Sequence, residues 1–190
     1  MATFISLDFV KNSKTMHQNP ISLRALEPED LTLLYTIEND PDIWDSSNAN
    51  GPYSRYTLKQ YIASSSTIYE SGEQRFVIDV ALVEENKKIP IGLIDITNYA
   101  PLDSRAEVGV VLLKEYRGQG YGLQALTLVE NYVTRWLRMH SLYAQVLVSN
   151  TYSCKLFEKA GYVIVSKLPK WHYVNGIYED VFIFMKTFSS

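Results

Sequence analysis

Seven segments of the chain have the apolar and β-branched composition of strands, and in most of them apolar and polar residues alternate. Asn175-Gly176 separates the last two segments and predicts a hairpin, and the polar residues 84–87 predict a turn between the second and third. Weak alternation in residues 4–9 predicts a short added strand or a mobile tail. The seven segments are residues 21–26, 74–83, 88–96, 106–113, 142–148, 162–166 and 177–186.

Residues 28–72 show the helical period of 3.6 residues in two places. A first helix begins at the Pro-Glu-Asp sequence of residues 28–30, and an Asn-Asp-Pro signal ends it at residues 39–41. Thr57 is expected to cap a second helix that runs to about Tyr69. Residues 42–56, rich in Ser, Asn, Gly and Pro, predict a loop between the two helices.

Two further helices are predicted in the second half of the chain. The longest covers residues 121–138, and the other covers residues 151–159 and ends at Gly161. Residues 98–104 are expected to form a loop before the fourth strand. The side chains of the longest helix that are expected to pack inward are Leu123, Leu126, Val129, Tyr132, Val133 and Trp136.

Length and composition indicate one domain and exclude several kinds of site. A chain of 190 residues can build one ample core, so we expect a single domain over residues 21–190 after an N-terminal extension over residues 1–20. Cys154 is the only cysteine, and the three histidines, His17, His140 and His172, lack the spacing of metal ligands, so we expect no disulfide and no metal.

The charge of the chain bears on its partners. A net charge of −3 gives no basic excess, so we expect no nucleic-acid partner and mildly favour a cationic or amine substrate. No segment has the character of a signal peptide or the length of a membrane span. We therefore expect a cytoplasmic protein with no membrane partner.

A glycine-rich stretch, Arg-Gly-Gln-Gly-Tyr-Gly at residues 117–122, stands between a predicted strand and the longest predicted helix. Glycines allow positive φ, so backbone N–H groups can converge where the helix begins, and Arg117 adds a full positive charge. These features favour a pyrophosphate. Leu123 stands where a dinucleotide fingerprint needs its third glycine, and no P-loop Gly-Lys-Ser/Thr is present. A turn that needs glycine only for geometry is the alternative.

This stretch resembles the Arg/Gln-x-x-Gly-x-Gly/Ala acetyl-CoA motif of the GNAT superfamily of N-acetyltransferases. From about Ile21 to Met185 the chain resembles the branch that includes ribosomal-protein N-terminal acetyltransferases and spermidine acetyltransferases. The resemblance implies an α+β protein with the GNAT acyl-CoA N-acyltransferase fold: a mixed central sheet of about seven strands, helices on both faces, and the strand at 142–148 beside the strand at 106–113. The other matching stretches are residues 91–98, 105–109, 150–153 and 159–162.

The resemblance also implies acetyl-CoA as co-substrate. Backbone groups of Val111, Leu112 and Leu113 would pair with its pantetheine arm, and an N–H there is the natural oxyanion donor. Asn150, with Ser153 beside it, resembles the family asparagine that holds the pantetheine, although capping of the following helix is an equally open role for Asn150. The loop residues implied in binding are Arg117, Gly118, Gln119, Gly120, Tyr121 and Gly122.

Glu107 is the candidate general base, acting directly or through water. Strand alternation places its side chain on one face with Gly109 and Val111. The alternative is an exposed carboxylate at a strand end. Gln145 stands where some relatives carry a second glutamate, and glutamine cannot take a proton.

The general acid is less well defined. Phe157 stands where many relatives carry a tyrosine acid, so Ser153 and Tyr152 are the candidates left nearby. A thiol has a pKa near 8.5, so the thiolate leaves with little help and the acid is dispensable. Without a paired base in view, Cys154 is expected to be a packed or semi-exposed helix residue.

The region of the first two helices is implied to form one wall of the acceptor groove. Its aromatic and acidic residues could hold an amine by charge and cation–π contact, or could be core aromatics and a solvated acidic face. These residues are Tyr35, Glu38, Asp40, Asp42, Trp44, Asp45, Tyr53, Tyr56, Tyr61 and Tyr69.

The leading hypothesis is an N-acetyltransferase that moves the acetyl group of acetyl-CoA to a primary amine by direct attack in a ternary complex. The acceptor is a small amine or polyamine, or a protein N-terminus, and a homodimer is an option. A non-catalytic acyl-CoA-binding module, suggested by Phe157 and Gln145, and a nucleotide-binding protein are the alternatives.

Overall fold

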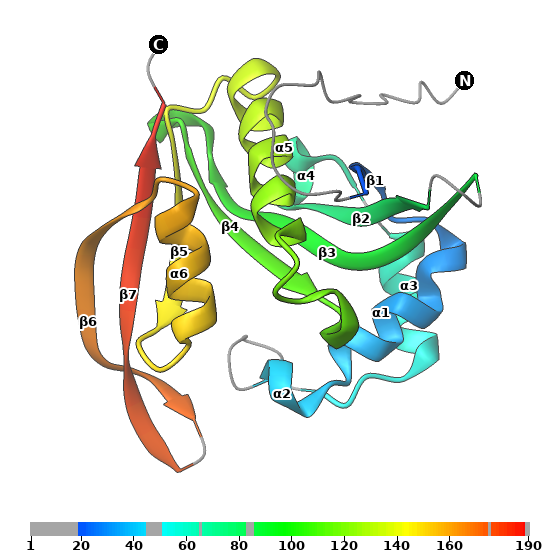
Figure 1. Ribbon diagram of the computed structural model, residues 1–190, viewed down its shortest axis with the longest axis horizontal. Coiled ribbons are helices and arrows are strands. Elements are labelled where there is room, and N and C mark those ends of the chain that lie inside the picture. The colour runs from blue at the N-terminus through cyan, green and yellow to red at the C-terminus, as the bar shows by residue number, and fades with distance from the viewer. Residues whose placement is uncertain (1–18, 45–50, 65, 83–85, 175, 189–190) are drawn as a thin grey trace.

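A computed structural model describes residues 19–44, 51–64, 66–82, 86–174 and 176–188. Seven strands form one mixed sheet in the order β1-β2-β3-β4-β5-β7-β6 (Figure 1), which confirms the expected fold. Only the β4–β5 pair is parallel. The strands are β1 (Ile21–Ala25), β2 (Gln74–Leu82), β3 (Lys87–Ala100), β4 (Arg105–Leu112), β5 (Ser141–Leu147), β6 (Val163–Val174) and β7 (Ile177–Thr187).

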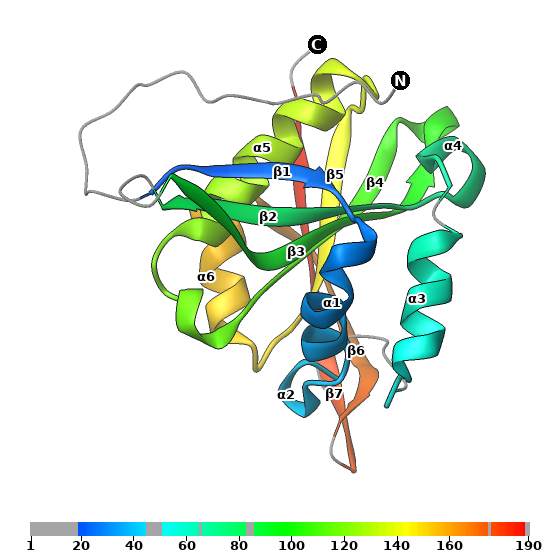
Figure 2. The ribbon, with the colours of Figure 1, turned by 90° about the vertical axis from the view of Figure 1, so that its right-hand side faces the viewer.

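Helices cover both faces of this sheet (Figure 2). The apolar residues of α1 and α3 pack on Val77 and Leu93, and we call this side the α1–α3 face. On the other face α5 buries Ala125, Leu126 and Val129, and α6 joins the same cluster. The helices are α1 (Leu31–Glu38), α2 (Pro41–Trp44), α3 (Arg55–Ala63), α4 (Ile68–Ser71), α5 (Tyr121–Arg135) and α6 (Thr151–Lys159).

The parallel pair β4–β5 is short. The strands pair only from Arg105 with Ser141 to Glu107 with Tyr143, and then diverge (Figure 1). Beyond Glu107, β4 has no strand partner on this side within the described part of the chain. We call residues 108–112 the open edge of β4.

Two arginines fasten α1 to the sheet. Before the helix, Arg24 bonds Asp30 at 2.6 Å and Asp79 at 2.7 Å, and both carboxylates are buried. At the end of the helix, Arg75 bonds Glu38 at 2.6 Å. Removing either arginine would leave carboxylates without their partner, so these ion pairs fix the position of α1 over the sheet.

The region before β2 differs from the expectation in two ways. Ser54, rather than Thr57, caps α3 by accepting the N–H of Thr57, and the expected single helix is split into α3 and α4. Gly72, with a left-handed backbone, ends α4. The expected loop after the first helix contains the single turn α2, while residues 45–50 lie outside the described residues.

The ends of three other elements also differ from those expected. β3 continues through most of the expected loop to Ala100, and β6 reaches Val174. The longest helix ends at Arg135, and Trp136 is 49% exposed under the Arg135 guanidinium, so its predicted inward packing is wrong. Asn175, the turn residues 84 and 85, and all of the N-terminal extension except Asn19 and Pro20 lie outside the described residues.

Candidate active site

The open edge of β4 offers backbone groups. The N–H of Leu113 bonds Ile91 of β3 at 2.9 Å, and the pairing of β3 with β4 is regular over this stretch. Because backbone groups alternate along a strand, Val110 and Leu112 direct theirs toward the open edge, whereas those of Val111 and Leu113 face β3. Of the three residues expected to pair with pantetheine, only Leu112 is therefore oriented for it.

Val111 and Leu113 instead pack with the apolar cluster under α1 and α3. Val110 replaces them as a candidate, and it was missed because the sequence pattern does not show which edge of a strand each N–H faces. The register of β3 against β4, which sequence reasoning did not use, supplies that information.

The glycine loop has the backbone form expected of an anion site. Gly118 and Gly120 have φ of 73° and 86°, in the region that glycine adopts easily. Gly120 is the N-cap of α5, and no side chain caps this helix end. The first N–H groups of α5 thus remain as donors for a phosphate oxygen.

Arg117 and Gln119 are both exposed and tied to nearby backbone. Arg117 donates from Nε to the oxygen of Leu112 at 2.8 Å, so its guanidinium lies between the loop and the open edge of β4. Gln119 donates to the oxygen of Glu115 at 2.6 Å. The bond to Leu112 leaves the terminal nitrogens of Arg117 as donors for an anion, while Gln119 stabilises the loop.

The last two loop residues support packing. The Tyr121 side chain is buried beside the ring of Tyr116. A Cβ on Gly122 would lie 3.2 Å from the Leu156 side chain, so this glycine permits α6 to approach α5. Only the backbone of Tyr121 and Gly122 is available to a ligand.

Glu107 lies at the last β4–β5 pair, inside a polar group. Its Oε2 accepts the Asn98 amide at 2.7 Å and, more weakly, the Gln145 amide at 3.4 Å. The Tyr143 hydroxyl lies beside both Glu107 and Asn98, and partial burial and the charge of Glu107 raise the pKa of Tyr143. Sequence reasoning found Glu107 and Gln145 but missed Asn98 and Tyr143.

On the α1–α3 face, the surface of β4 next to Glu107 is exposed at Gly109. Apart from the chain neighbours of Gly109, no atom of the described residues lies within 4 Å of where its Cβ would be. Its partner on β3 is Asp95, which accepts two bonds from Arg75, and Arg75 also bonds Glu38 and lies 5.4 Å from the Tyr61 ring. Two carboxylates share one guanidinium here, so the group carries a net negative charge.

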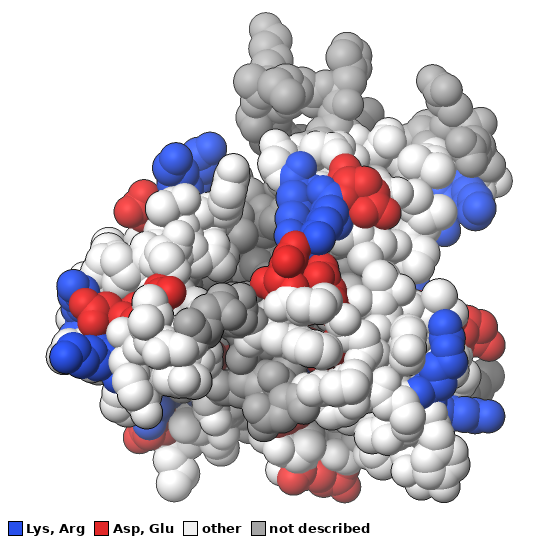
Figure 3. Space-filling view, turned by 90° about the horizontal axis from the view of Figure 1, so that it is seen from below, with Lys and Arg blue, Asp and Glu red and all other residues white. Residues whose placement is uncertain are grey.

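The remaining residues of the expected acceptor wall are spread out. Asp42 bonds Lys114 at 2.6 Å, and this ion pair lowers the pKa of Asp42. Figure 3, a view of the molecule from below, shows acidic and basic side chains next to each other on this surface. Tyr35 lies under Arg55 at 4.4 Å, and Tyr56 and Tyr69 are exposed. Asp45 lies outside the described residues.

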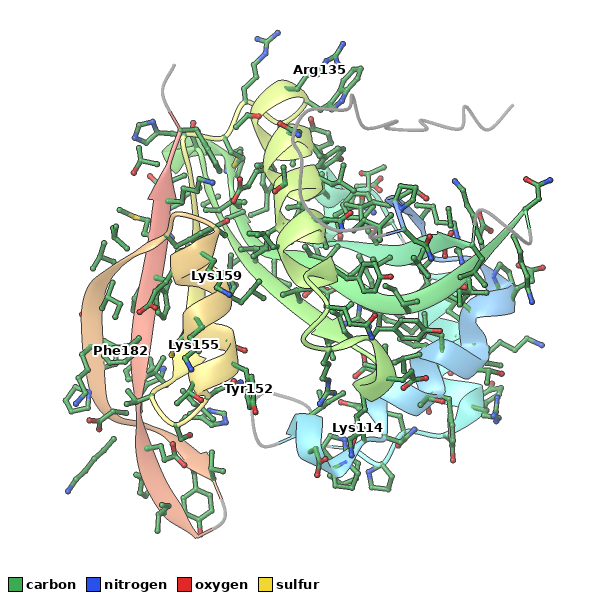
Figure 4. All side chains as sticks on the ribbon, viewed as in Figure 1. Lys114, Arg135, Tyr152, Lys155, Lys159 and Phe182 are labelled. Atoms are coloured by element: carbon green, nitrogen blue, oxygen red, sulfur yellow. The ribbon has the colours of Figure 1, made fainter. Side chains whose placement is uncertain are left out.

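Residues of α6 have mixed roles. Asn150 caps the helix by accepting the Ser153 N–H at 3.0 Å, so the capping role is confirmed. Tyr152 is 88% exposed, and Figure 4 shows it with Lys155 and Lys159 along α6. Phe157 is 3% exposed and its ring packs on Tyr162 and Phe184, which makes it a core residue.

Across the residues that the structure describes, no group of three His, Cys, Asp or Glu side chains is placed to hold a metal ion. None of the helices in the described ranges is long and apolar enough to span a membrane.

Comparisons with known proteins agree with this arrangement. Residues 21–163 match the family model described as an acetyltransferase (GNAT) domain. The chain is 28% identical over 161 residues to a spermidine N(1)-acetyltransferase of Vibrio cholerae, a match that covers 85% of this chain and 89% of the relative.

Solved structures give the same result. The crystal structure of spermidine N-acetyltransferase from Vibrio cholerae in complex with CoA and spermine is similar with a TM-score of 0.79 and 26% identity, over 88% of this chain and 95% of that one. A dodecameric structure of spermidine N-acetyltransferase from the same organism has a TM-score of 0.73 at 26% identity, over 88% and 93%. The chain belongs to the GNAT acetyltransferase family and is an acetyl-CoA-dependent N-acetyltransferase that acts on an amine.

Proposed function

We propose that the acceptor is a small polyamine, which attacks acetyl-CoA directly in a ternary complex with Glu107 as the general base. The observation that carries this proposal is the position of Glu107. Its carboxylate lies where β4 and β5 separate, on the α1–α3 face beside the exposed Gly109. The relatives named as spermidine acetyltransferases support the substrate class.

The co-substrate would lie along the open edge of β4. Its pyrophosphate would bind the N–H groups at the start of α5 and the terminal nitrogens of Arg117, a charge-assisted contact. The backbone groups of Val110 and the N–H of Leu112, whose oxygen already accepts the Arg117 Nε, would pair with the pantetheine arm, and one of the two N–H groups would stabilise the oxyanion. Asn150 and Ser153 lie at the start of α6, beside α5, and would contact the same arm.

The reaction then needs one proton acceptor. An alkylamine is mostly protonated at neutral pH because its pKa is about 10.4, so Glu107 would remove a proton before the nitrogen attacks the thioester carbon. The C–N bond forms, the oxyanion collapses and the C–S bond breaks. The thiolate leaves and takes its proton from solvent, or from the Ser153 hydroxyl one helical turn before Phe157. Exposed Tyr152 is the weaker candidate for this step.

A protein N-terminus is the second candidate acceptor. Its amine has a pKa near 8 and depends less on a base, and Ser153 resembles a serine of the branch with ribosomal-protein acetyltransferases. The net negative group of Glu38, Arg75 and Asp95 beside Gly109 favours the polyamine, because one end of a polyamine stays cationic while the other reacts.

The test is a panel of acceptors at neutral pH. CoA release is followed with spermidine, spermine, a diamine, a monoamine and N-terminal peptides, and mass spectrometry identifies the acetylated nitrogen. We expect spermidine or spermine to give the highest kcat/KM. Faster turnover of peptides than of every polyamine would overturn the assignment.

We further propose that residues 21–190 form one catalytic domain, which works in the cytoplasm, where acetyl-CoA is available.

This domain would associate with a second copy through β6. β6 is an edge strand of the described sheet, and its exposed apolar residues are unsuited to water. Light scattering of the wild type and of Ile164→Lys would test this: the wild type should form an oligomer that the variant weakens. A monomeric wild type would contradict it. The exposed apolar residues of β6 include Val163, Ile164, Val165 and Trp171.

A further inference from the structure

Asn98 stands at an irregular point of the sheet. Thr97 pairs with Glu107 and Ala100 pairs with Arg105, so two residues of β3, Asn98 and Tyr99, face one residue of β4. This two-against-one arrangement is a β-bulge, a device that redirects a side chain.

The backbone of Asn98 is also unusual. Its φ is 49°, in the left-handed region where asparagine is one of the few tolerated residues. In a regular strand, side chains alternate between faces, so residue 98 would lie on the opposite face from Thr97 and its partner Glu107. The bulge and the left-handed backbone instead allow the Asn98 amide to reach the Glu107 carboxylate.

The contact orients that carboxylate. Asn98 Nδ2 donates to Glu107 Oε2 at 2.7 Å, and Gln145 Nε2 approaches the same oxygen at 3.4 Å. Both amides therefore act on Oε2, which restricts rotation of the carboxylate and leaves Oε1 without an amide donor.

From this geometry we propose that Asn98 is a positioning residue, which holds the Glu107 carboxylate in the orientation needed to take a proton from the acceptor amine. The proposal rests on the function proposed above for Glu107. The charged and titratable neighbours on adjoining elements are Tyr143 on β5 and Arg105 on β4, and Arg105 is itself paired with Asp103 at 3.1 Å. Neither can replace Asn98 as an amide donor to Oε2.

The test uses two variants and a matched control. Asn98→Gly keeps the positive φ but removes the amide, and Asn98→Asp keeps the size but replaces the donor by a second carboxylate. Asn86→Gly is the control, since Asn86 has φ of 47° and is exposed at the turn before β3, far along that strand from Glu107. All are assayed for kcat and KM with spermidine and for affinity toward acetyl-CoA.

We expect Asn98→Gly to lower kcat about 10-fold and Asn98→Asp about 100-fold, with unchanged acetyl-CoA affinity. The Asn86→Gly control should match the wild type. In a Glu107→Gln background Asn98→Gly should cause no further loss of kcat, which a merely structural role would not predict.

Two failures can be told apart. If Glu107→Gln keeps the wild-type kcat, the proposed base is wrong. If Glu107→Gln loses activity but Asn98→Gly keeps the wild-type kcat, only the role of Asn98 is overturned. A further loss from Asn98→Gly in the Glu107→Gln background would also overturn it.

Discussion

The Nε atom of Arg117 donates a hydrogen bond to the backbone oxygen of Leu112 at 2.8 Å. This bond ties the glycine loop to the open edge of β4, the two parts of the site that a CoA molecule would join. It also fixes the guanidinium so that its terminal nitrogens are the part left for an anion. The proposed roles of the loop and of the strand edge therefore depend on each other.

Arg117→Lys should weaken this link while keeping the charge. Lysine cannot bond Leu112 and present a planar pair of donors at once, so we expect acetyl-CoA to bind about 10-fold more weakly while kcat changes less than about twofold. Calorimetric titration with acetyl-CoA measures the affinity. Arg135→Lys, at the other end of α5 (Figure 4), is the control. Equal affinity of Arg117→Lys and the control would contradict the assignment.

Gly118 and Gly72 form a matched pair for the loop backbone. Their φ values are 73° and 74°, and neither has an atom within 4 Å of where its Cβ would lie. An alanine at either position should destabilise the fold similarly, by about 1–2 kcal/mol, because both would be left-handed. Only Gly118→Ala should also reduce the rise in Tm that acetyl-CoA causes. The same ligand-induced rise in both variants would argue against the loop as the anion site.

Gly109→Leu tests the acceptor side. A side chain can be added here without a clash and should not lower Tm, because glycine is itself unfavourable within a strand. The leucine side chain would occupy the open space beside Glu107, so we expect KM for spermidine to rise about 10-fold or more with unchanged acetyl-CoA affinity. If spermidine turnover is unaffected, the acceptor does not pass over Gly109.

Cys154 should be a poor nucleophile. Burial and the nearby charge of Glu158 raise the pKa of this thiol, so it remains protonated at neutral pH. We expect alkylation by iodoacetamide to be slower than that of free cysteine at pH 7 and to accelerate only at a higher pH than for free cysteine. Cys154→Ala should keep the wild-type kcat. Rapid alkylation at pH 7 with loss of activity would show that Cys154 takes part in the site.

Much of the fold follows from local patterns. The strand alternation, the glycine loop before α5 and the Asn150 cap each depend on residues close in sequence, and these features were predicted correctly. Boundaries were less accurate where pairing with another strand decides them: β6 reaches Val174 because it stays paired with β7 as far as Ile177. The break between α3 and α4, after which Thr67 and Glu70 form a capping box, was also missed, and Trp136 is exposed because α5 ends one residue before it.

The candidate site was only partly predictable for a similar reason. Glu107 and Arg117 belong to recognisable motifs, but the partners of Glu107 come from two other strands, β3 and β5. Asn98 reaches it through a bulge and Tyr143 through the short β4–β5 pairing, and neither feature is visible in the local sequence. The alternation rule gave the face of Val111 and Leu113 but not which edge their N–H groups use, so Val110 was missed.

The most direct test of the account is the pH dependence of kcat/KM for spermidine in the wild type and in Glu107→Gln, a change that keeps the shape but removes the base. We expect a loss of about 10²–10⁴-fold at pH 7 that shrinks as the pH rises toward 10, because more of the amine is then already deprotonated. Acetyl-CoA affinity should stay the same. Wild-type rates at pH 7, or a deficit that is constant with pH, would contradict the role of Glu107 as general base.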